Sequence, residues 1–195
     1  MAPPLKGEAM NEVKAALGGL GLLLRGDDRA LLNYDFSEGG FWRSFRWPLL
    51  ALLFYVVLMQ PDAAELAVWG DNTLGYAAAR GAEFLLAWFV YLLLMAGVSR
   101  AFGLGNRFAL FVVLYNWAQA ITTGATLPLL AATDLGLLGP GILQGWSTAL
   151  LLAWLYIVAR IARIGLGAAW SLALAAAMLD LVVSILLHRA IDSVL

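Results

Sequence analysis

The chain has 195 residues, of which 63% are hydrophobic and 13% are charged, whereas a soluble domain has about 45–50% apolar and about 25% charged residues. This composition excludes an ordinary soluble domain and indicates an integral membrane protein. The net charge of −1 gives no basic footprint for nucleic acid, and the absence of cysteine excludes disulfides and cysteine-ligated metals. With a single histidine, His188, we expect no metal site and no cofactor.

Residues 1–40 form a charged cytoplasmic arm ahead of the hydrophobic part of the chain. Between residues 8 and 24, apolar side chains recur at helical spacing and charged side chains occupy the other faces. The apolar set is Met10, Val13, Leu17, Leu20 and Leu24. This pattern predicts an amphipathic helix on the membrane surface, where lipids are its partners. Three glycines weaken the helix, so the bilayer or the rest of the protein must hold it. The segment lacks an apolar signal-peptide core, so we expect it to be retained.

The stretch from Asp35 to Pro48 marks the boundary between the arm and the hydrophobic chain. Aromatic rings and arginines alternate here, and both settle where lipid headgroups meet hydrocarbon. Ser37 is placed to cap the helix that follows. The stretch therefore predicts a membrane-interface anchor, made of Phe41, Trp42, Arg43, Arg46 and Trp47.

Hydrophobic runs follow at regular intervals, and a membrane span needs about 20 predominantly apolar residues. The predicted spans cover residues 41–59, 75–98, 108–130, 138–159 and 168–187. The first is short as an apolar run and reaches full length only with the aromatic stretch before it. The expected fold is all-α: a polytopic membrane protein in which residues 41–195 form a bundle of five transmembrane helices behind an amphipathic N-terminal arm.

The basic residues lie unevenly on the two sides of the predicted bundle. Ten of them fall in the arm, in the aromatic stretch and in the loops after the second and fourth spans, whereas only Arg189 falls on the other side. The positive-inside rule then places the N-terminus in the cytoplasm and the C-terminus in the periplasm. We expect the protein in the bacterial inner membrane.

Three ionisable residues lie inside predicted spans, where such residues are rare and indicate a functional site. Arg80 and Glu83 are in the second span, three residues apart, and are placed to pair on one helix face. Asp180 is in the fifth span, at a similar depth of the bilayer. Two interpretations stay open: the charges neutralise one another and fix the helix register, or they line a polar pocket or an ion or proton path. In the second interpretation, one arginine beside two carboxylates leaves one carboxylate under-paired.

Amides and hydroxyls follow single helix faces in the later spans, and lipid cannot satisfy their hydrogen bonds. We therefore expect these side chains to face the bundle interior near Asp180. The set comprises Asn116, Gln119 and Thr123 in the third span, Gln144 and Thr148 in the fourth, and Ser184 in the fifth. Interhelical hydrogen bonding and a solute-binding cavity both explain the pattern.

Small residues recur every four positions in the last two spans and indicate close helix packing. They are Gly141 and Gly145 in the fourth span and Ala169, Ala173 and Ala177 in the fifth. We expect this packing to be intramolecular, with homo-oligomerisation as the alternative.

The segment Asp35-Phe36…Gly39-Gly40-Phe41-Trp42 is similar to the Asp-Leu-x-Gly-Pro-Phe-Trp segment that leads into the first span of the Yip-type family of small membrane proteins. The chain departs from that pattern by one extra residue before Gly39 and by Gly40 in place of proline. A cytoplasmic arm followed by five spans also resembles the prokaryotic members that carry a Yip-like domain. The resemblance implies a non-enzymatic membrane organiser, with no catalytic residues to transfer.

Two function classes stay open. The preferred one is a non-enzymatic adaptor of the inner membrane, whose arm presents a cytoplasmic face to lipid or to a protein partner. The alternative is a small permease or ion- or proton-coupled transporter that uses the intramembrane polar cluster. We do not expect an enzyme, because the sequence offers no nucleophile–base or metal constellation. A water-accessible cavity that reaches Asp180 from outside is the observation that favours the transporter.

Overall fold

A computed structural model describes residues 6–58, 69–70 and 72–194 of the chain, and within these ranges every regular element is helical. The elements in order are α1 (Lys6–Leu24), η1 (Asp28–Asn33), α2 (Glu38–Ser44), α3 (Arg46–Leu58), α5 (Thr73–Ala101), η2 (Gly105–Arg107), α6 (Phe108–Asp134), α7 (Pro140–Ile161), η3 (Ala162–Leu166) and α8 (Trp170–Val194). Among the described residues, four helices are long and apolar enough to cross a membrane. They coincide with the predicted spans 75–98, 108–130, 138–159 and 168–187. The helical, multi-pass character of the chain therefore agrees with the prediction.

The first predicted span, residues 41–59, is different. The chain forms two helices here, α2 and α3, with Phe45 between them. Pro48 lies in the first turn of α3, where its missing N–H costs no hydrogen bond. The 13 residues of α3 reach about 20 Å, which is less than the about 30 Å of a bilayer core. Residues 59–68 lie outside the described residues, so five spans are not established.

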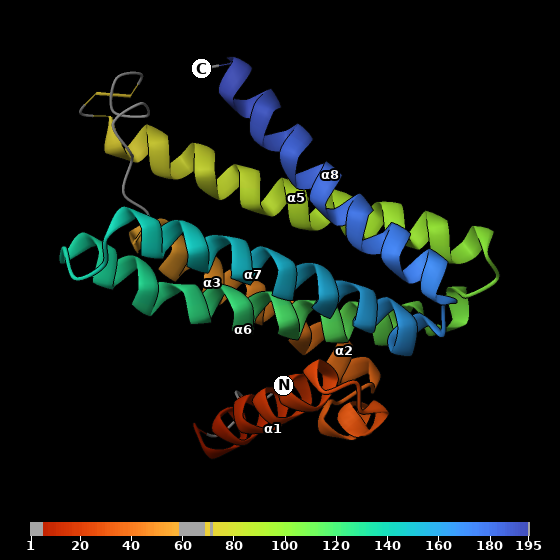
Figure 1. The fold of residues 1–195 in the computed structure, drawn as a ribbon. Coiled ribbons are helices and arrows are strands. Elements are labelled where there is room, and N and C mark those ends of the chain that lie inside the picture. The colour runs from red at the N-terminus through yellow and green to blue at the C-terminus, as the bar shows by residue number, and fades with distance from the viewer. Residues whose placement is uncertain (1–5, 59–68, 71, 195) are drawn as a thin grey trace.

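The long helices run antiparallel and form two layers (Figure 1). One layer contains α5 and α8, and the other contains α3, α6 and α7; α7 also packs on α8. The layers meet at the end where α5 leads into α6 and α7 leads into α8, and they diverge toward the opposite end. We name the first the basic end, because it carries Arg100, Arg107, Arg160 and Arg163.

The core lies toward the basic end. Tyr91, Phe111 and Tyr115 pack ring against ring, with centroids 4.9 to 6.2 Å apart, and are almost completely buried. The Arg107 guanidinium donates to the carbonyl oxygens of Ile164 at 2.7 Å and Gly165 at 3.1 Å. These carbonyls belong to η3, the single π-helical turn that ends α7, so Arg107 supplies hydrogen-bond partners that the helix end lacks. Gly167 then reverses the chain at a φ of 73°, a conformation that favours glycine.

Small residues in the two last spans have different surroundings. Ala173 and Ala177 are buried against neighbouring helices, as the prediction of intramolecular packing requires. Gly141 and Gly145 are exposed, and within the described chain a Cβ at either position meets nothing within 4 Å. Within the described residues, the predicted close packing is therefore present at Ala173 and Ala177 and absent at the two glycines and at Ala169, which is exposed.

The arm packs against the bundle. Ala16, Leu20 and Leu23 of α1 are buried, and α1 contacts both α6 and α7. Two ion pairs fix this position: Glu12 binds Arg46 at 2.5 Å and Arg43 at 3.3 Å. Part of the predicted lipid-binding face is thus covered by protein. The apolar residues that stay exposed on α1 are Met10, Leu17 and Leu24.

Candidate functional site

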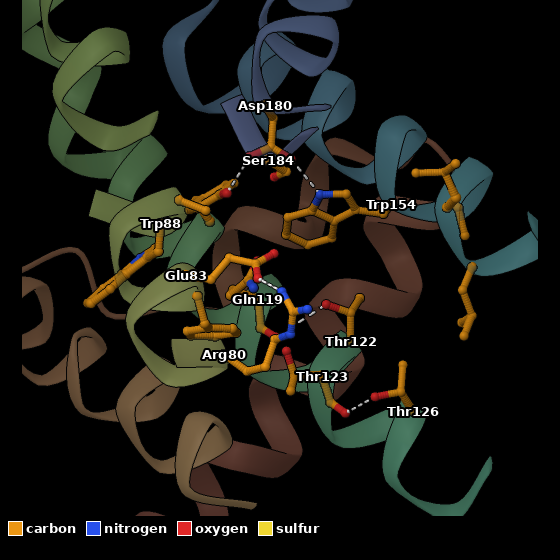
Figure 2. A pocket seen from close by; sticks show the side chains of 16 residues that line it. Arg80, Glu83, Trp88, Gln119, Thr122, Thr123, Thr126, Trp154, Asp180 and Ser184 are labelled. Carbon is orange, nitrogen blue, oxygen red and sulfur yellow. Dashed lines mark hydrogen bonds and ion pairs between the residues drawn. The ribbon is translucent and has the colours of Figure 1, made fainter. Parts of the chain in front are cut away.

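A cavity of about 370 Å³ lies between α5, α6, α7 and α8, a volume typical of small-molecule sites (Figure 2). Its polar lining residues are Arg80, Glu83, Tyr115, Gln119, Thr122, Thr123, Thr126, Asp180 and Ser184. Its more apolar lining residues are Phe84, Ala87, Trp88, Leu150, Leu151, Ala153 and Trp154. Six predicted cluster residues therefore border one space: Arg80, Glu83, Gln119, Thr123, Asp180 and Ser184.

Arg80 forms a charged network between α5 and α8, toward the end opposite the basic end. Its side chain is 6% exposed, and the guanidinium binds Glu83 at 2.6 Å, the pairing that the three-residue spacing predicts. A second nitrogen of Arg80 lies 3.0 Å from Asp192, and Glu83 also lies 2.9 Å from His188 Nδ1. Arg80 is therefore bound by two carboxylates, which more than neutralise its positive charge.

Asp180 has different partners. The Tyr115 hydroxyl donates to its Oδ1 at 2.5 Å, and the Trp154 indole N–H donates to its Oδ2 at 2.6 Å. The side chain is buried, and both donors are neutral. Among the described residues, no basic side chain forms an ion pair with Asp180. Asp180 is thus the carboxylate without a cationic partner, which is expected where one arginine and two carboxylates lie in the same cluster.

Asn116 is buried next to the cavity but does not line it. Its Oδ1 accepts the Trp88 indole N–H at 3.0 Å, and its Nδ2 donates to the Ser44 hydroxyl at 2.9 Å. Ser44 in turn donates to the Phe41 carbonyl at 2.7 Å. Asn116 therefore joins α2, α5 and α6, which is the interhelical hydrogen-bonding role that the sequence allowed.

Gln144 and Thr148 lie outside the cavity and are exposed, so the prediction that they face the interior differs from the structure. The Thr148 hydroxyl donates to the Gln144 carbonyl at 2.9 Å, within its own helix. This local bond satisfies the hydroxyl without a neighbouring helix, which is how threonine is tolerated on an exposed helix face.

The sequence interpretation missed His188 and Asp192 as members of the charged network. A signal for them exists, because Asp180, Ser184, His188 and Asp192 recur every four residues and follow one face of α8. The predicted span ended at residue 187, whereas α8 continues as a helix to Val194. Both residues therefore lie beyond the end of the predicted span.

The predicted interface anchor divides into inward and outward residues. Trp42 is 66% exposed, as an interface residue requires. Trp47 instead packs on Trp117, with ring centroids 4.6 Å apart, and Phe41 contacts Phe45 at 5.3 Å. Together with the binding of Arg43 and Arg46 to Glu12, these contacts show that the stretch packs largely within the protein.

The segment that carries the family resemblance forms the start of α2. The Ser37 hydroxyl caps the helix by accepting the Gly40 N–H at 3.1 Å, as predicted. A Cβ at Gly40 would lie 2.2 Å from the Asp35 carbonyl oxygen, so the turn requires glycine. Hydrogen bonds from Ser37 and the nearby charge of Arg43 hold the pKa of Asp35 below its ordinary value.

No group of His, Asp and Glu side chains in the described part of the chain could hold a metal ion, and this includes the residues around His188. Arg80 occupies the centre of that network, where a cation would otherwise sit.

Comparison of the chain with family models, with curated proteins and with solved structures gave no match. The resemblance to the Yip-type family stays a prediction that rests on residues 35–42.

Proposed function

We propose that this protein is a permease for small solutes in the bacterial inner membrane, with a substrate-binding cavity between its long helices. The observation that carries the proposal is the cavity that reaches Asp180. An adaptor needs a surface but no internal space, whereas a permease needs a space with polar groups at membrane depth. The cavity offers both, so the transporter, which was the alternative on sequence grounds, becomes the preferred function.

The orientation in this proposal follows from the loop charges. With the basic end in the cytoplasm, the Arg80 network and the diverging ends of the helices face the periplasm. The packed aromatic core and the Arg107 contacts then lie on the cytoplasmic side of the cavity. The proposed state is open toward the outside, in a five-span topology with a cytoplasmic N-terminus and a periplasmic C-terminus.

An adaptor role through the arm is the second candidate. It is favoured by the exposed apolar residues of α1, since Met10 is 58% and Leu17 is 50% exposed. These side chains are available to lipid or to a protein partner. Self-association through the exposed Gly141–Gly145 face of α7 is compatible with either function.

Single-cysteine labelling tests the permease proposal, because the natural chain contains no cysteine. Thr126→Cys and Ser184→Cys place a thiol in the cavity lining, and Leu86→Cys on α5 is the lipid-facing control. We expect a membrane-impermeant, charged methanethiosulfonate added from the periplasmic side to modify the first two and spare the control. Equal, slow labelling at all three positions would show that the cavity holds no water and would exclude the permease.

Phe102→Cys tests the orientation in the same experiment. Phe102 is 63% exposed and lies at the basic end, between α5 and η2. We expect its labelling only after the membrane is permeabilised, whereas labelling in intact spheroplasts contradicts the proposed topology.

A further inference from the structure

We propose that the cavity binds a lipophilic organic cation and that Asp180 is its charge partner. This inference rests on the proposed function and specifies the class of solute. Three independent features of the lining point to a cation with apolar substituents: the balance of charge, the aromatic side chains around Asp180, and the apolar character of the remaining wall.

The balance of charge favours a positive ligand. Asp180 carries a carboxylate at membrane depth, and its hydrogen-bond donors, Tyr115 and Trp154, bring no positive charge. A buried carboxylate without a cationic partner is costly, and an entering cation removes that cost. Arg80 does not favour an anion in the cavity, because Glu83 and Asp192 already bind it at 2.6 and 3.0 Å. An anion entering the cavity would have to break these ion pairs.

Two aromatic side chains, Tyr115 and Trp154, hydrogen-bond to the carboxylate. The bond from Trp154 holds its indole beside Asp180, and Figure 2 shows the Trp154 ring between Asp180 and the Arg80–Glu83 pair. Tyr115 lies next to it, with ring centroids 5.5 Å apart, and Trp88 lines another part of the cavity. Aromatic faces attract a cation within about 6 Å of the ring, most strongly when water is excluded. A cation in this cavity therefore shares it with three aromatic side chains, those of Trp88, Tyr115 and Trp154.

The rest of the lining suits apolar substituents better than a sugar or another hydroxyl-rich solute. Phe84, Leu150 and Leu151 offer hydrocarbon surface. Two threonine hydroxyls on α6 donate within their own helix, since Thr122 donates to the Ala118 carbonyl at 2.7 Å and Thr126 donates to the Thr123 carbonyl at 2.6 Å. The cavity thus combines a carboxylate that lacks a cationic partner with hydrocarbon and aromatic lining residues.

The test measures equilibrium binding to the purified full-length protein in detergent, with ions of matched shape and opposite charge. Tetraphenylphosphonium is the cation, tetraphenylborate the anion, and triphenylphosphine oxide a neutral analogue. We expect saturable binding of the cation, at least about 10-fold tighter than that of the anion or the neutral compound. Equal affinity of the wild-type protein for the two ions overturns the inference. This comparison needs no variant and is independent of any folding defect.

Variants then assign the charge partner. Asp180→Asn removes the charge and is expected to weaken cation binding by about 10-fold or more, while Asp180→Glu keeps most of the affinity. Glu38→Gln, an exposed carboxylate of α2, is the charge-matched control and leaves binding unchanged. Wild-type affinity in a folded Asp180→Asn variant, judged by gel filtration, contradicts the assignment.

Cysteine labelling separates this inference from the proposed function. Bound tetraphenylphosphonium is expected to slow the modification of the Thr126→Cys variant. If the cysteine reacts but the cation neither binds nor protects it, the substrate class is wrong and the water-accessible cavity stands. If the cysteine does not react at all, the permease proposal fails, and the inference fails with it.

Discussion

Trp154 of α7 donates its indole N–H to Asp180 of α8 at 2.6 Å, and Tyr115 of α6 occupies the other oxygen of the same carboxylate. The Asp180 side chain thereby connects α6, α7 and α8 beside the cavity. Asp180 is also the carboxylate of the site that lacks a cationic partner, so its contributions to stability and to ligand binding need separate tests.

Asp180→Asn is expected to lower the free energy of unfolding by about 1–2 kcal/mol. The amide keeps one acceptor oxygen but places an NH2 group against the second donor, and interhelical hydrogen bonds in membranes are worth about 0.6–2 kcal/mol each. Thermal unfolding in detergent measures the change, with Glu38→Gln as the control. An unchanged midpoint means that the two hydrogen bonds do not contribute to stability.

Trp154→Phe removes the indole donor and keeps an aromatic ring in the cavity wall. We expect a loss of about 0.6–2 kcal/mol, measured in the same assay. Trp146→Phe is the matched control on the same helix, because Trp146 is 51% exposed. It is expected to change stability by less than about 0.5 kcal/mol. Equal effects of the two substitutions contradict the importance of the Trp154–Asp180 bond.

Asn116→Leu breaks the connection from Trp88 through Asn116 to Ser44. The Trp88 indole N–H then stays buried without its partner, which costs about 1–3 kcal/mol. Gln144→Leu is the contrasting variant, since its side chain is exposed, and it should leave the unfolding midpoint almost unchanged. A larger effect at Gln144 than at Asn116 would reverse the roles that we assign to these two amides.

Glu12→Arg should release α1 from the bundle, because it places a third positive charge beside Arg43 and Arg46. The pairs are about one-third exposed, so their contribution to the unfolding free energy is modest, about 1 kcal/mol or less. The sensitive measurement is limited trypsin digestion, in which we expect faster cleavage after Lys14 and Arg25. The double variant Glu12→Arg with Arg46→Glu should restore protection, and a failure to restore it means that the ion pair does not hold the arm.

Acidification tests the start of α2. The hydrogen bonds from Ser37 and the charge of Arg43 keep the pKa of Asp35 below its ordinary value of 3.8. The carboxylate therefore stabilises the fold above pH 3.8, and this contribution disappears as the pH falls through the lower pKa of the folded state. Because the side chain is 48% exposed, we expect an effect below about 1 kcal/mol. The Asp35→Asn variant should lack this acid-dependent loss, and identical pH profiles for the two proteins contradict the expectation.

The helices were the most predictable part of the fold. Long apolar runs set the four helices that are long and apolar enough to cross a membrane, since lipid leaves the backbone no alternative to internal hydrogen bonding. The convergence of Arg80, Glu83 and Asp180 on one cavity also followed, because antiparallel helices place residues of equal depth at the same level. The hydrogen-bond donors to Asp180 could not be predicted from depth in the bilayer. A buried indole N–H such as that of Trp154 needs an acceptor, but spacing along a helix does not say which neighbouring helix provides it.

Contacts of high sequence separation were the least predictable. Glu12 and Arg46 are 34 residues apart, and the composition of each segment fits a membrane surface as well as it fits an ion pair. Gln144 and Thr148 show the converse error. Their spacing resembles that of Gln119 and Thr123, but a hydroxyl that bonds to its own helix needs no second helix, so periodicity cannot distinguish an outer face from an inner one.

The position of α1 sets the order in which the protein can assemble. Ala16 packs with Val113 and Trp117 of α6, and Asp28 pairs with Arg160 of α7, 132 residues later in the chain. The arm is the first described segment to be synthesised, yet its binding surface is complete only after α7 has been made. The contacts that hold the arm therefore cannot all form until α7 has been synthesised.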